Sequence, residues 1–253
     1  MNDQLASPPL LLVPGHWLGA WAWDEVLAHL PSADARTLAI TLPGLDGDDA
    51  ERATRTLADQ VDAIRNALAS LGASSDDPAV IAAHSGANAP VSIVLDRHPE
   101  LVRRVVWVDS GPMASGMAFA PGLPAAVSEL PLPPFDELAQ QASLEGIEPE
   151  GLARFRARAV AEPAPVVREP VILTNDARLA VPTTLVCCSI SGEQVMQMAE
   201  SGHPMFAEVA RLQQVDVIDL PTGHWPMWST PRALAEIIRA EADRPADERA
   251  ASR

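Results

Sequence analysis

The sequence contains no lysine and few positive charges of any kind. All 18 basic residues are arginines, and the 34 acidic residues give a formal net charge of −16. A chain with this balance repels the phosphates of nucleic acids and the headgroups of anionic membranes. We therefore expect neither nucleic acid nor a membrane as a partner, and nothing in the sequence indicates the oligomeric state.

Cysteine is nearly absent as well. The two cysteines, Cys187 and Cys188, are neighbours in an apolar run, a pattern typical of buried strand thiols in a reducing compartment and not of a disulfide framework. The first residues, Met1 to Gln4, lack the basic region of a signal peptide, and the apolar run Leu10–Val13 is too short to span a bilayer. These absences predict a cytoplasmic protein.

The ligand patterns of metal and phosphate sites are missing too. No cysteines and histidines have the spacing of a zinc site, and no glycine-rich loop could cradle a phosphate. Asp46, Asp48 and Asp49 form an acidic cluster, but it lacks the further ligands of a calcium loop, so we interpret it as a solvated loop. We expect neither a metal nor a cofactor.

Apolar residues, by contrast, make up 47% of the 253 residues and recur in short runs. A chain of this length and composition can bury one compact core without a metal or a disulfide. Strands are expected at Leu10–Val13, Thr37–Leu42, Ala79–Ala83, Val105–Val108, Thr183–Cys188 and Val215–Leu220. Helical patterns lie between them, over 57–71, over Asn88–Arg97 and from Pro231 onward, and the charged tail from Asp243 is expected to fray. The alternation predicts an α/β fold, a mostly parallel sheet with helices on both faces.

Residues 112–180 interrupt this alternation. They contain prolines, small residues and two helical pieces, Phe135–Leu144 and Leu152–Val160, but no good core strand. An insertion at this point should lie above the carboxyl ends of the strands, where open α/β sheets bind their ligands. We therefore predict a core formed by residues 1–111 and 181–253, with residues 112–180 as a helical cap.

A candidate nucleophile lies in Ala83-His84-Ser85-Gly86-Ala87, between an expected strand and an expected helix. A serine on such a turn exposes its hydroxyl at the helix N-terminus, and the positions two before and two after it must be small. The usual pattern is G-x-S-x-G, and here alanines replace both outer glycines. The context favours Ser85 as a nucleophile over a serine that merely caps a turn. We expect His84 to pack or hydrogen-bond away from the chemistry.

A candidate base, His224, follows the last expected strand and precedes the final helix, in Thr222-Gly223-His224-Trp225. At neutral pH a serine hydroxyl needs a neighbouring imidazole to take its proton. In the chain order serine, acid, histidine, the histidine occupies this loop. We therefore predict His224 as the general base, because the other histidines have no comparable placement.

Together these motifs resemble the α/β-hydrolase superfamily over nearly the whole chain. The stretch Pro14-Gly15-His16-Trp17-Leu18-Gly19-Ala20-Trp21-Ala22-Trp23 is similar to the first loop, H-G-A-x-H-G-x-W-x-W, of the small group of methylesterases, hydroxynitrile lyases and related bacterial esterases, with Pro14 in place of its histidine. The resemblance implies an oxyanion hole formed by the backbone N–H groups of His16 and Gly86, each typically worth about 3–4 kcal/mol. The side chains of His16 and Trp17 could line the substrate pocket, although packing is the commoner role for this tryptophan.

The acid partner of His224 has more than one candidate. In many members of the superfamily it follows the strand expected at Thr183–Cys188, but here that strand leads into Ser189-Ile190-Ser191-Gly192-Glu193. Asp109 follows the strand expected at Val105–Val108, where some hydrolases carry their acid. We favour Asp109 over Glu193, and a site without a working acid is the third alternative.

The resemblance implies a serine hydrolase that cleaves a small, mainly apolar ester or lactone through an acyl-enzyme on Ser85. An apolar pocket is expected because residues 112–180 are mostly apolar and Arg154, Arg156 and Arg158 alternate along a helix without converging. One alternative is a carbon–carbon-bond hydrolase or lyase that uses the same triad, because His224-Trp225 with Trp228 resembles the G-H-W-x-x-W ending of such hydrolases. The other is a binding protein with a degenerate triad.

Overall fold

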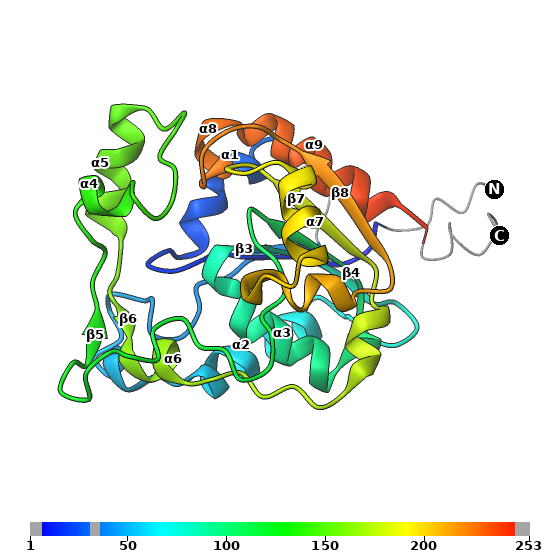
Figure 1. Cartoon of the computed structure of the whole chain (residues 1–253), viewed down its shortest axis with the longest axis horizontal. Helices are drawn as coiled ribbons and strands as arrows, with labels where there is room; N and C mark the ends of the chain where they lie inside the picture. The colour runs from blue at the N-terminus through cyan, green and yellow to red at the C-terminus, as the bar shows by residue number, and fades with distance from the viewer. Residues whose placement is uncertain (1–6, 31–35, 246–253) are drawn as a thin grey trace.

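The structure, a computed structural model, describes residues 7–30 and 36–245. Its centre is a parallel sheet with the strand order β2-β1-β3-β4-β7-β8 (Figure 1). The strands are β1 (Leu10–Val13), β2 (Thr37–Ala39), β3 (Ala79–His84), β4 (Val102–Val108), β7 (Thr183–Cys187) and β8 (Val215–Asp219). The strand order reverses between β1 and β3. At such a switch point the carboxyl ends of parallel strands leave room for a ligand.

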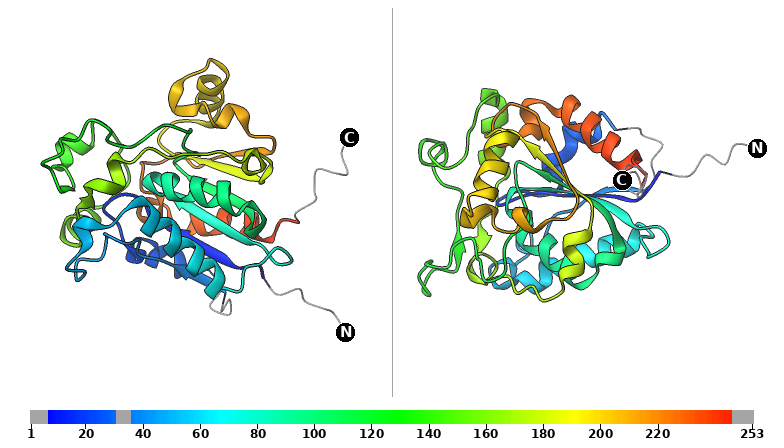
Figure 2. Two further views of the ribbon diagram at one scale, coloured as in Figure 1. Left: turned by 90° about the horizontal axis from the view of Figure 1, so that it is seen from below. Right: turned by 45° about the vertical axis from the view of Figure 1, so that its right-hand side comes forward.

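Helices cover both faces of this sheet, as Figures 1 and 2 show. Successive strand residues point to opposite faces, so Leu11 and Val13 of β1 pack into one apolar cluster and Leu10 and Leu12 into the other. The first face carries α2 (Leu57–Ser70), α3 (Asn88–Arg97) and α7 (Gly192–Glu200), and the second carries α1 (Asp24–Leu27), α8 (Pro226–Ser229) and α9 (Pro231–Asp243). The predicted fold class is therefore confirmed.

Short 3₁₀ helices complete the connections. They are η1 (Ala20–Trp23), η2 (Arg52–Thr54), η3 (Ser85–Ala87), η4 (Pro99–Leu101), η5 (Asp176–Ala180), η6 (Pro204–Phe206) and η7 (Val209–Arg211). Within the described part of the chain, no helix is both long and apolar enough to cross a membrane.

The observed strands differ from the expected ones mainly at their ends. β2 stops at Ala39, earlier than expected, because it is an edge strand whose one partner, β1, itself ends at Val13. β4 begins earlier, at Val102, because its first residues already pair with β3, whereas its pairing with β7 starts at Val105. Cys187 and Cys188 are buried and unpaired, as expected.

The expected helices form, with the predicted boundaries where local signals are strong. Thr56 and Asp59 form the capping box that begins α2, and Gly72, with a φ of +77°, follows its end. At the other end of the chain, the tail was expected to fray from Asp243. Arg244 is instead held by Asp216 and Glu241, and residues 246–253 lie outside the described part.

The middle part of residues 112–180 lies beside the carboxyl ends of the strands, to the left in Figure 1, and the last of these residues return toward α3. Residues 112–180 contain β5 (Glu129–Leu130), α4 (Phe135–Leu138), α5 (Pro149–Arg158), β6 (Glu162–Pro163) and α6 (Ala164–Arg168), with β5 and β6 paired as an antiparallel ribbon. The helix expected over Phe135–Leu144 ends early, at Leu138. The chain beyond it turns so that the backbone carbonyls of Ser143 and Glu145 accept hydrogen bonds from His224 and Gly223.

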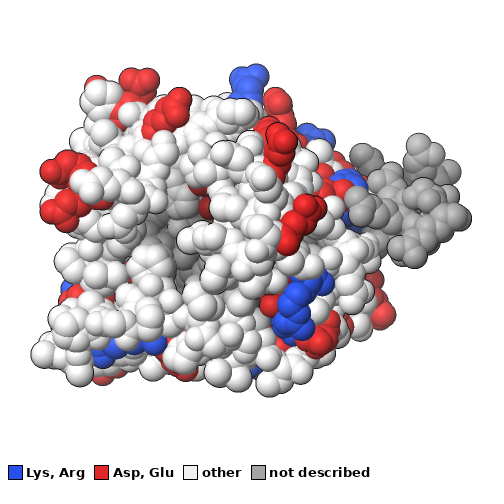
Figure 3. Space-filling model, in the orientation of Figure 1, with Lys and Arg blue, Asp and Glu red and all other residues white. Residues whose placement is uncertain are grey.

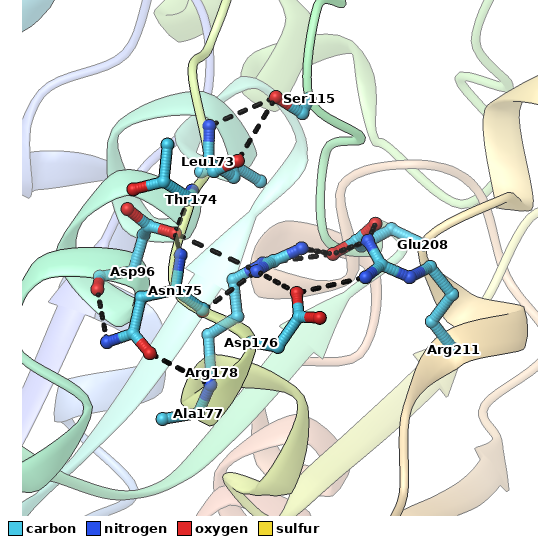
Figure 4. A network of polar contacts seen from close by, with 10 residues as sticks. All are labelled: Asp96, Ser115, Leu173, Thr174, Asn175, Asp176, Ala177, Arg178, Glu208 and Arg211. Carbon is cyan, nitrogen blue, oxygen red and sulfur yellow. Dashed lines mark hydrogen bonds and ion pairs between the residues drawn. The ribbon is translucent and has the colours of Figure 1, made fainter.

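A buried ionic network anchors the point at which this segment rejoins the core (Figure 4). Arg178 donates from Nε and Nη2 to Oε1 of Glu208, at 3.0 and 2.5 Å. Asp96 of α3 accepts hydrogen bonds from the backbone N–H groups of Thr174 and Asn175, at 2.7 and 2.8 Å. Buried charges are tolerated when they are paired and hydrogen-bonded in this way. The network therefore fixes the end of the segment to the sheet's helical layer.

Candidate active site

Ser85 lies on a tight turn between β3 and α3. Its φ of 48° is unusual for a residue with a side chain and is typical of a strained functional turn. The flanking Ala83 and Ala87 are fully buried, so alanine is small enough for the two outer positions of the turn. The loop after β1 packs directly on this turn, because a Cβ on Gly15 would lie 2.8 Å from Cβ of Ser85.

His224 lies within hydrogen-bond distance of this serine, with 2.8 Å between its Nε2 and Oγ of Ser85. Its backbone is held on both sides. The N–H group of His224 donates to the carbonyl of Ser143 at 2.7 Å, and its carbonyl accepts from Nε2 of His84 at 2.8 Å. The imidazole is therefore fixed relative to Ser85 by contacts with both β3 and residues 112–180.

Asp109 lies on the other side of the His224 ring. Its Oδ2 is 2.6 Å from Nδ1 of His224 and accepts a hydrogen bond from the hydroxyl of Ser189 at 2.6 Å. Its Oδ1 accepts from the backbone N–H groups of Cys188 and Ser189, at 2.9 Å each. Glu193, the other candidate acid, lies exposed in the first turn of α7. Of the two carboxylates, Asp109 is the one against the ring.

The environment of Asp109 keeps its carboxylate ionised. Burial by itself would raise the pKa of Asp109, but the hydrogen bonds and charge of His224, together with the hydrogen bonds from Ser189, lower it to about 2. This carboxylate can therefore receive the N–H group of His224 at any pH near neutrality.

His84 is closer to the chemistry than its place in the sequence indicated. Its ring is fully buried and lies 4.9 Å from that of His224, and its hydrogen bond to the His224 carbonyl means that Nε2 carries a proton. Burial and the neighbouring imidazole lower the pKa of His84 to about 3. His84 is therefore neutral, and it positions the backbone of His224.

The residues predicted for the oxyanion hole also come together. The His16 ring packs against Gly86 so closely that a Cβ at position 86 would overlap it. Gly86 lies in the first turn of η3, where backbone N–H groups have no partner within the helix. No hydrogen bond joins the N–H group of His16 to another described residue. Both backbone donors are therefore available to a ligand.

Trp17 is buried, with 8% of its surface exposed. Its backbone N–H group donates to Oε1 of Glu162 at 3.1 Å, and its indole N–H group donates to the carbonyl of Leu130 at 3.0 Å. Trp17 thus connects the loop after β1 to both strands of the β5–β6 ribbon.

Three residues at this site were not among those predicted from the sequence. Ser189 could be suspected because it follows β7, whose end neighbours that of β4. Ser143 and Glu162 belong to residues 112–180, where no periodic pattern indicates which side chains face the core. Among the described residues, no cluster of histidine, cysteine and carboxylate side chains has the arrangement of a metal site.

Figure 3 shows a hollow between residues 112–180 and the sheet, and most of the surface around it is uncharged. The exposed aromatic Phe119, from these residues, lies with its ring centroid 4.0 Å from that of His16. The candidate site therefore has an apolar wall beside its polar groups.

Comparison with known proteins identifies the family. Residues 10–237 match the sequence model of the alpha/beta hydrolase family, and the chain belongs to this family. No curated protein is significantly similar in sequence.

Several solved structures share the fold over nearly their whole length. Tomato methylketone synthase I complexed with 2-tridecanone is 16% identical, with 93% of this chain and 98% of that chain covered and a TM-score of 0.70. A methylesterase, MES16, from Arabidopsis is 14% identical, with 92% of this chain and 99% of that chain covered and a TM-score of 0.68. An extracellular alpha/beta-hydrolase from a Paenibacillus species is 18% identical, with 94% of this chain and 100% of that chain covered and a TM-score of 0.66. The predicted resemblance to α/β-hydrolases is confirmed, whereas the cytoplasmic location stays a prediction.

Proposed function

We propose that the protein is a serine hydrolase that cleaves a small, mainly apolar ester or lactone. The observation that carries this proposal is the chain of hydrogen bonds from Ser85 through His224 to Asp109, at 2.8 and 2.6 Å. This arrangement joins a nucleophile, a base and a carboxylate that orients the base, which is the geometry of acyl-transfer catalysis.

The mechanism follows from these contacts. Nε2 of His224 takes the proton of the Ser85 hydroxyl while Oγ attacks the substrate carbonyl, and the carbonyl oxygen becomes negative. The backbone N–H groups of His16 and Gly86 bind this oxyanion. His224 then gives the proton to the leaving alcohol. Water, deprotonated by His224, attacks the acyl-enzyme, and the proton returns to Ser85 as the carboxylic acid leaves.

Asp109 and His84 support this base in different ways. The ionised Asp109 holds the proton of neutral His224 on Nδ1, so that Nε2 faces Ser85, and stabilises the imidazolium that forms. His84 stays neutral, so no positive charge opposes protonation of His224 from that side.

We propose that residues 112–180 form the cap over the site. The contacts of three arginines in this segment support a neutral substrate. Arg154 pairs with Glu25 at 2.5 Å, Arg156 donates to the carbonyl of Pro133 at 2.6 Å, and Arg158 stacks over Trp21. None of these three cations is free to bind a substrate carboxylate. A methylesterase among the structural neighbours agrees with an ester substrate.

Carbon–carbon-bond cleavage on the same triad is the second candidate. It is motivated by the Trp225 and Trp228 pattern after the histidine and by the likeness to methylketone synthase I. A small diketone or keto acid with an apolar chain is the substrate class to test for it.

Labelling of Ser85 tests the proposal. A fluorophosphonate should modify this residue, and Ser85→Ala should lower kcat for p-nitrophenyl acetate at least about a thousandfold, because the nucleophile is lost. Ser201→Ala, a change at the exposed end of α7, is the control and should leave kcat unchanged. A label on another residue, or full activity in Ser85→Ala, contradicts the assignment and favours a binding protein.

The same assay with size-matched esters separates the substrate classes. Neutral esters and lactones should have a higher kcat/KM than esters that carry a carboxylate. A preference for the charged set contradicts the apolar pocket, and turnover of a diketone without ester cleavage favours the second candidate.

A further inference from the structure

A second carboxylate–imidazole pair lies beside the proposed oxyanion hole. Nδ1 of His16 is 2.9 Å from Oε1 of Glu162, and the exposed fractions of the two residues are 9% and 1%. Glu162 belongs to β6, whereas His16 lies in the loop after β1. The mechanism above uses only the backbone of His16, so its side chain has no task there.

The hydrogen bonds of Glu162 define the protonation of this pair. Oε1 also accepts the backbone N–H group of Trp17, at 3.1 Å, so it acts as an acceptor toward both neighbours and Nδ1 of His16 carries a proton. Oε2 is buried and has no hydrogen-bond partner among the described residues. A buried carboxylate with so few donors needs an opposite charge beside it. A second proton, on Nε2 of His16, would supply that charge.

The position of the ring indicates what this second proton faces. A Cβ at Gly86 would overlap Cδ2 and Nε2 of the imidazole, so the absence of a side chain at Gly86 lets the ring lie over its backbone. Phe119 packs against the same imidazole. No hydrogen bond to Nε2 occurs within the described part of the chain. Nε2 is therefore an unused polar group next to the backbone donor of the oxyanion hole.

We propose that the His16 side chain is a third hydrogen-bond donor of the oxyanion hole and that Glu162 positions it. This rests on the proposed function, because it requires a carbonyl under attack by Ser85. During the attack the π electrons of the carbonyl move to its oxygen, and Nε2–H of His16 binds the negative oxygen together with the two backbone donors. No proton leaves His16, so the contribution is electrostatic. His16 is then a catalytic residue and Glu162 a positioning residue.

Two amide substitutions separate this role from a purely structural one. The amide nitrogen of glutamine reaches the place of Nε2, and that of asparagine reaches the place of Nδ1. His16→Gln therefore keeps a donor toward the substrate and loses the bond to Glu162. His16→Asn keeps the bond to Glu162 and loses the donor. His16→Phe removes both donors and keeps the ring against Phe119.

The rate at which a fluorophosphonate modifies Ser85 measures the effect without knowledge of the substrate, because the phosphoryl oxygen enters the oxyanion hole. We expect His16→Asn and His16→Phe to be labelled at about a tenth of the rate of the unmodified protein, or more slowly still. The labelling rate of His16→Gln should stay within about threefold of that of the unmodified protein. For p-nitrophenyl acetate, kcat should fall in the same order while KM changes little, because the donor acts in the transition state. Melting curves verify that each variant is folded. If His16→Phe does not fold, the comparison of His16→Gln with His16→Asn still tests the proposal.

Each outcome has a distinct meaning. If His16→Gln is labelled more slowly than His16→Asn, the bond to Glu162 matters and the donor on Nε2 does not, which would overturn the proposal. Equal labelling rates in all variants would also overturn it. Absence of any label on Ser85 in the unmodified protein would overturn the proposed function, and this inference with it.

Discussion

The site contains two carboxylate–imidazole pairs, one within the core and one that joins the core to residues 112–180, and the two pairs are built differently. Asp109 and His224 both follow strands of the sheet. Each oxygen of Asp109 accepts two hydrogen bonds, from His224, Ser189 and the backbone of Cys188. Glu162, from the β5–β6 ribbon, uses one oxygen for His16 and the backbone of Trp17, and its other oxygen has no partner among the described residues.

This difference decides what each imidazole can do. The anionic form of Asp109 is stabilised by donors other than His224, so on the proposed mechanism His224 can take and release a proton in each cycle. On the same proposal, the charge that compensates Glu162 comes from His16, and His16 acts as a fixed donor. The proposed roles of the two histidines, a base and a fixed donor, thus differ because different groups bind their carboxylates.

The largest expected effect comes from removing the charge of the first pair. Asp109→Asn should lower kcat about ten-thousandfold, because the amide no longer holds the His224 tautomer that faces Ser85 or balances the imidazolium. Steady-state kinetics with p-nitrophenyl acetate measures this. Glu193→Gln, an exposed change on α7, is the control and should be close to neutral. The opposite ranking would move the acid to Glu193.

A smaller effect is expected from the second pair. Glu162→Gln keeps an oxygen for His16 and Trp17 but removes the negative charge that favours the proton on Nε2, so kcat should fall about tenfold with little change in KM. In the His16→Gln background the same substitution should cost almost nothing further, because the two residues act as one unit. Glu129→Gln, on the partner strand β5, is the control. Fully additive effects would contradict the coupling of Glu162 and His16.

The smallest effect concerns stability in acid. The pKa of Asp109 in the folded protein is about 2, below its ordinary value of 3.8, so the unfolded chain binds this proton more readily. The resulting stability is fully present above about pH 5 and is lost as the pH falls toward 2. By pH 3, the unmodified protein should have lost about 1 kcal/mol of its unfolding free energy relative to Asp109→Asn.

Urea denaturation at pH 6 and pH 3 measures this difference between the two proteins, with Asp62→Asn on the exposed side of α2 as a control. A gap between the unmodified protein and Asp109→Asn that stays constant over this range would mean that the hydrogen bonds to Asp109 do not favour its ionised form.

The sheet, its helical layers and the two residues proposed to react could be predicted from the amino-acid sequence alone. Each of these depends on short-range patterns. Short apolar runs such as Leu10–Val13, bounded by turn residues, are typical of buried strands, and the capping box of Thr56 and Asp59 favours a helix start through local contacts. Ser85 and His224 are recognisable because a strand–turn–helix junction and the loop after the last strand fix what a side chain there can reach.

Which carboxylate lies against which imidazole depends on the tertiary structure. Asp109 and Glu193 both follow parallel strands that lie side by side, so both were plausible partners of His224 until the turn after β7 placed backbone N–H groups against Asp109 and carried Glu193 into α7. Glu162 was not predicted at all, because a two-residue strand among prolines has no periodicity. Its contact with His16 spans 146 positions of the chain, and a contact at that separation arises only when the whole fold brings the ribbon onto the loop after β1.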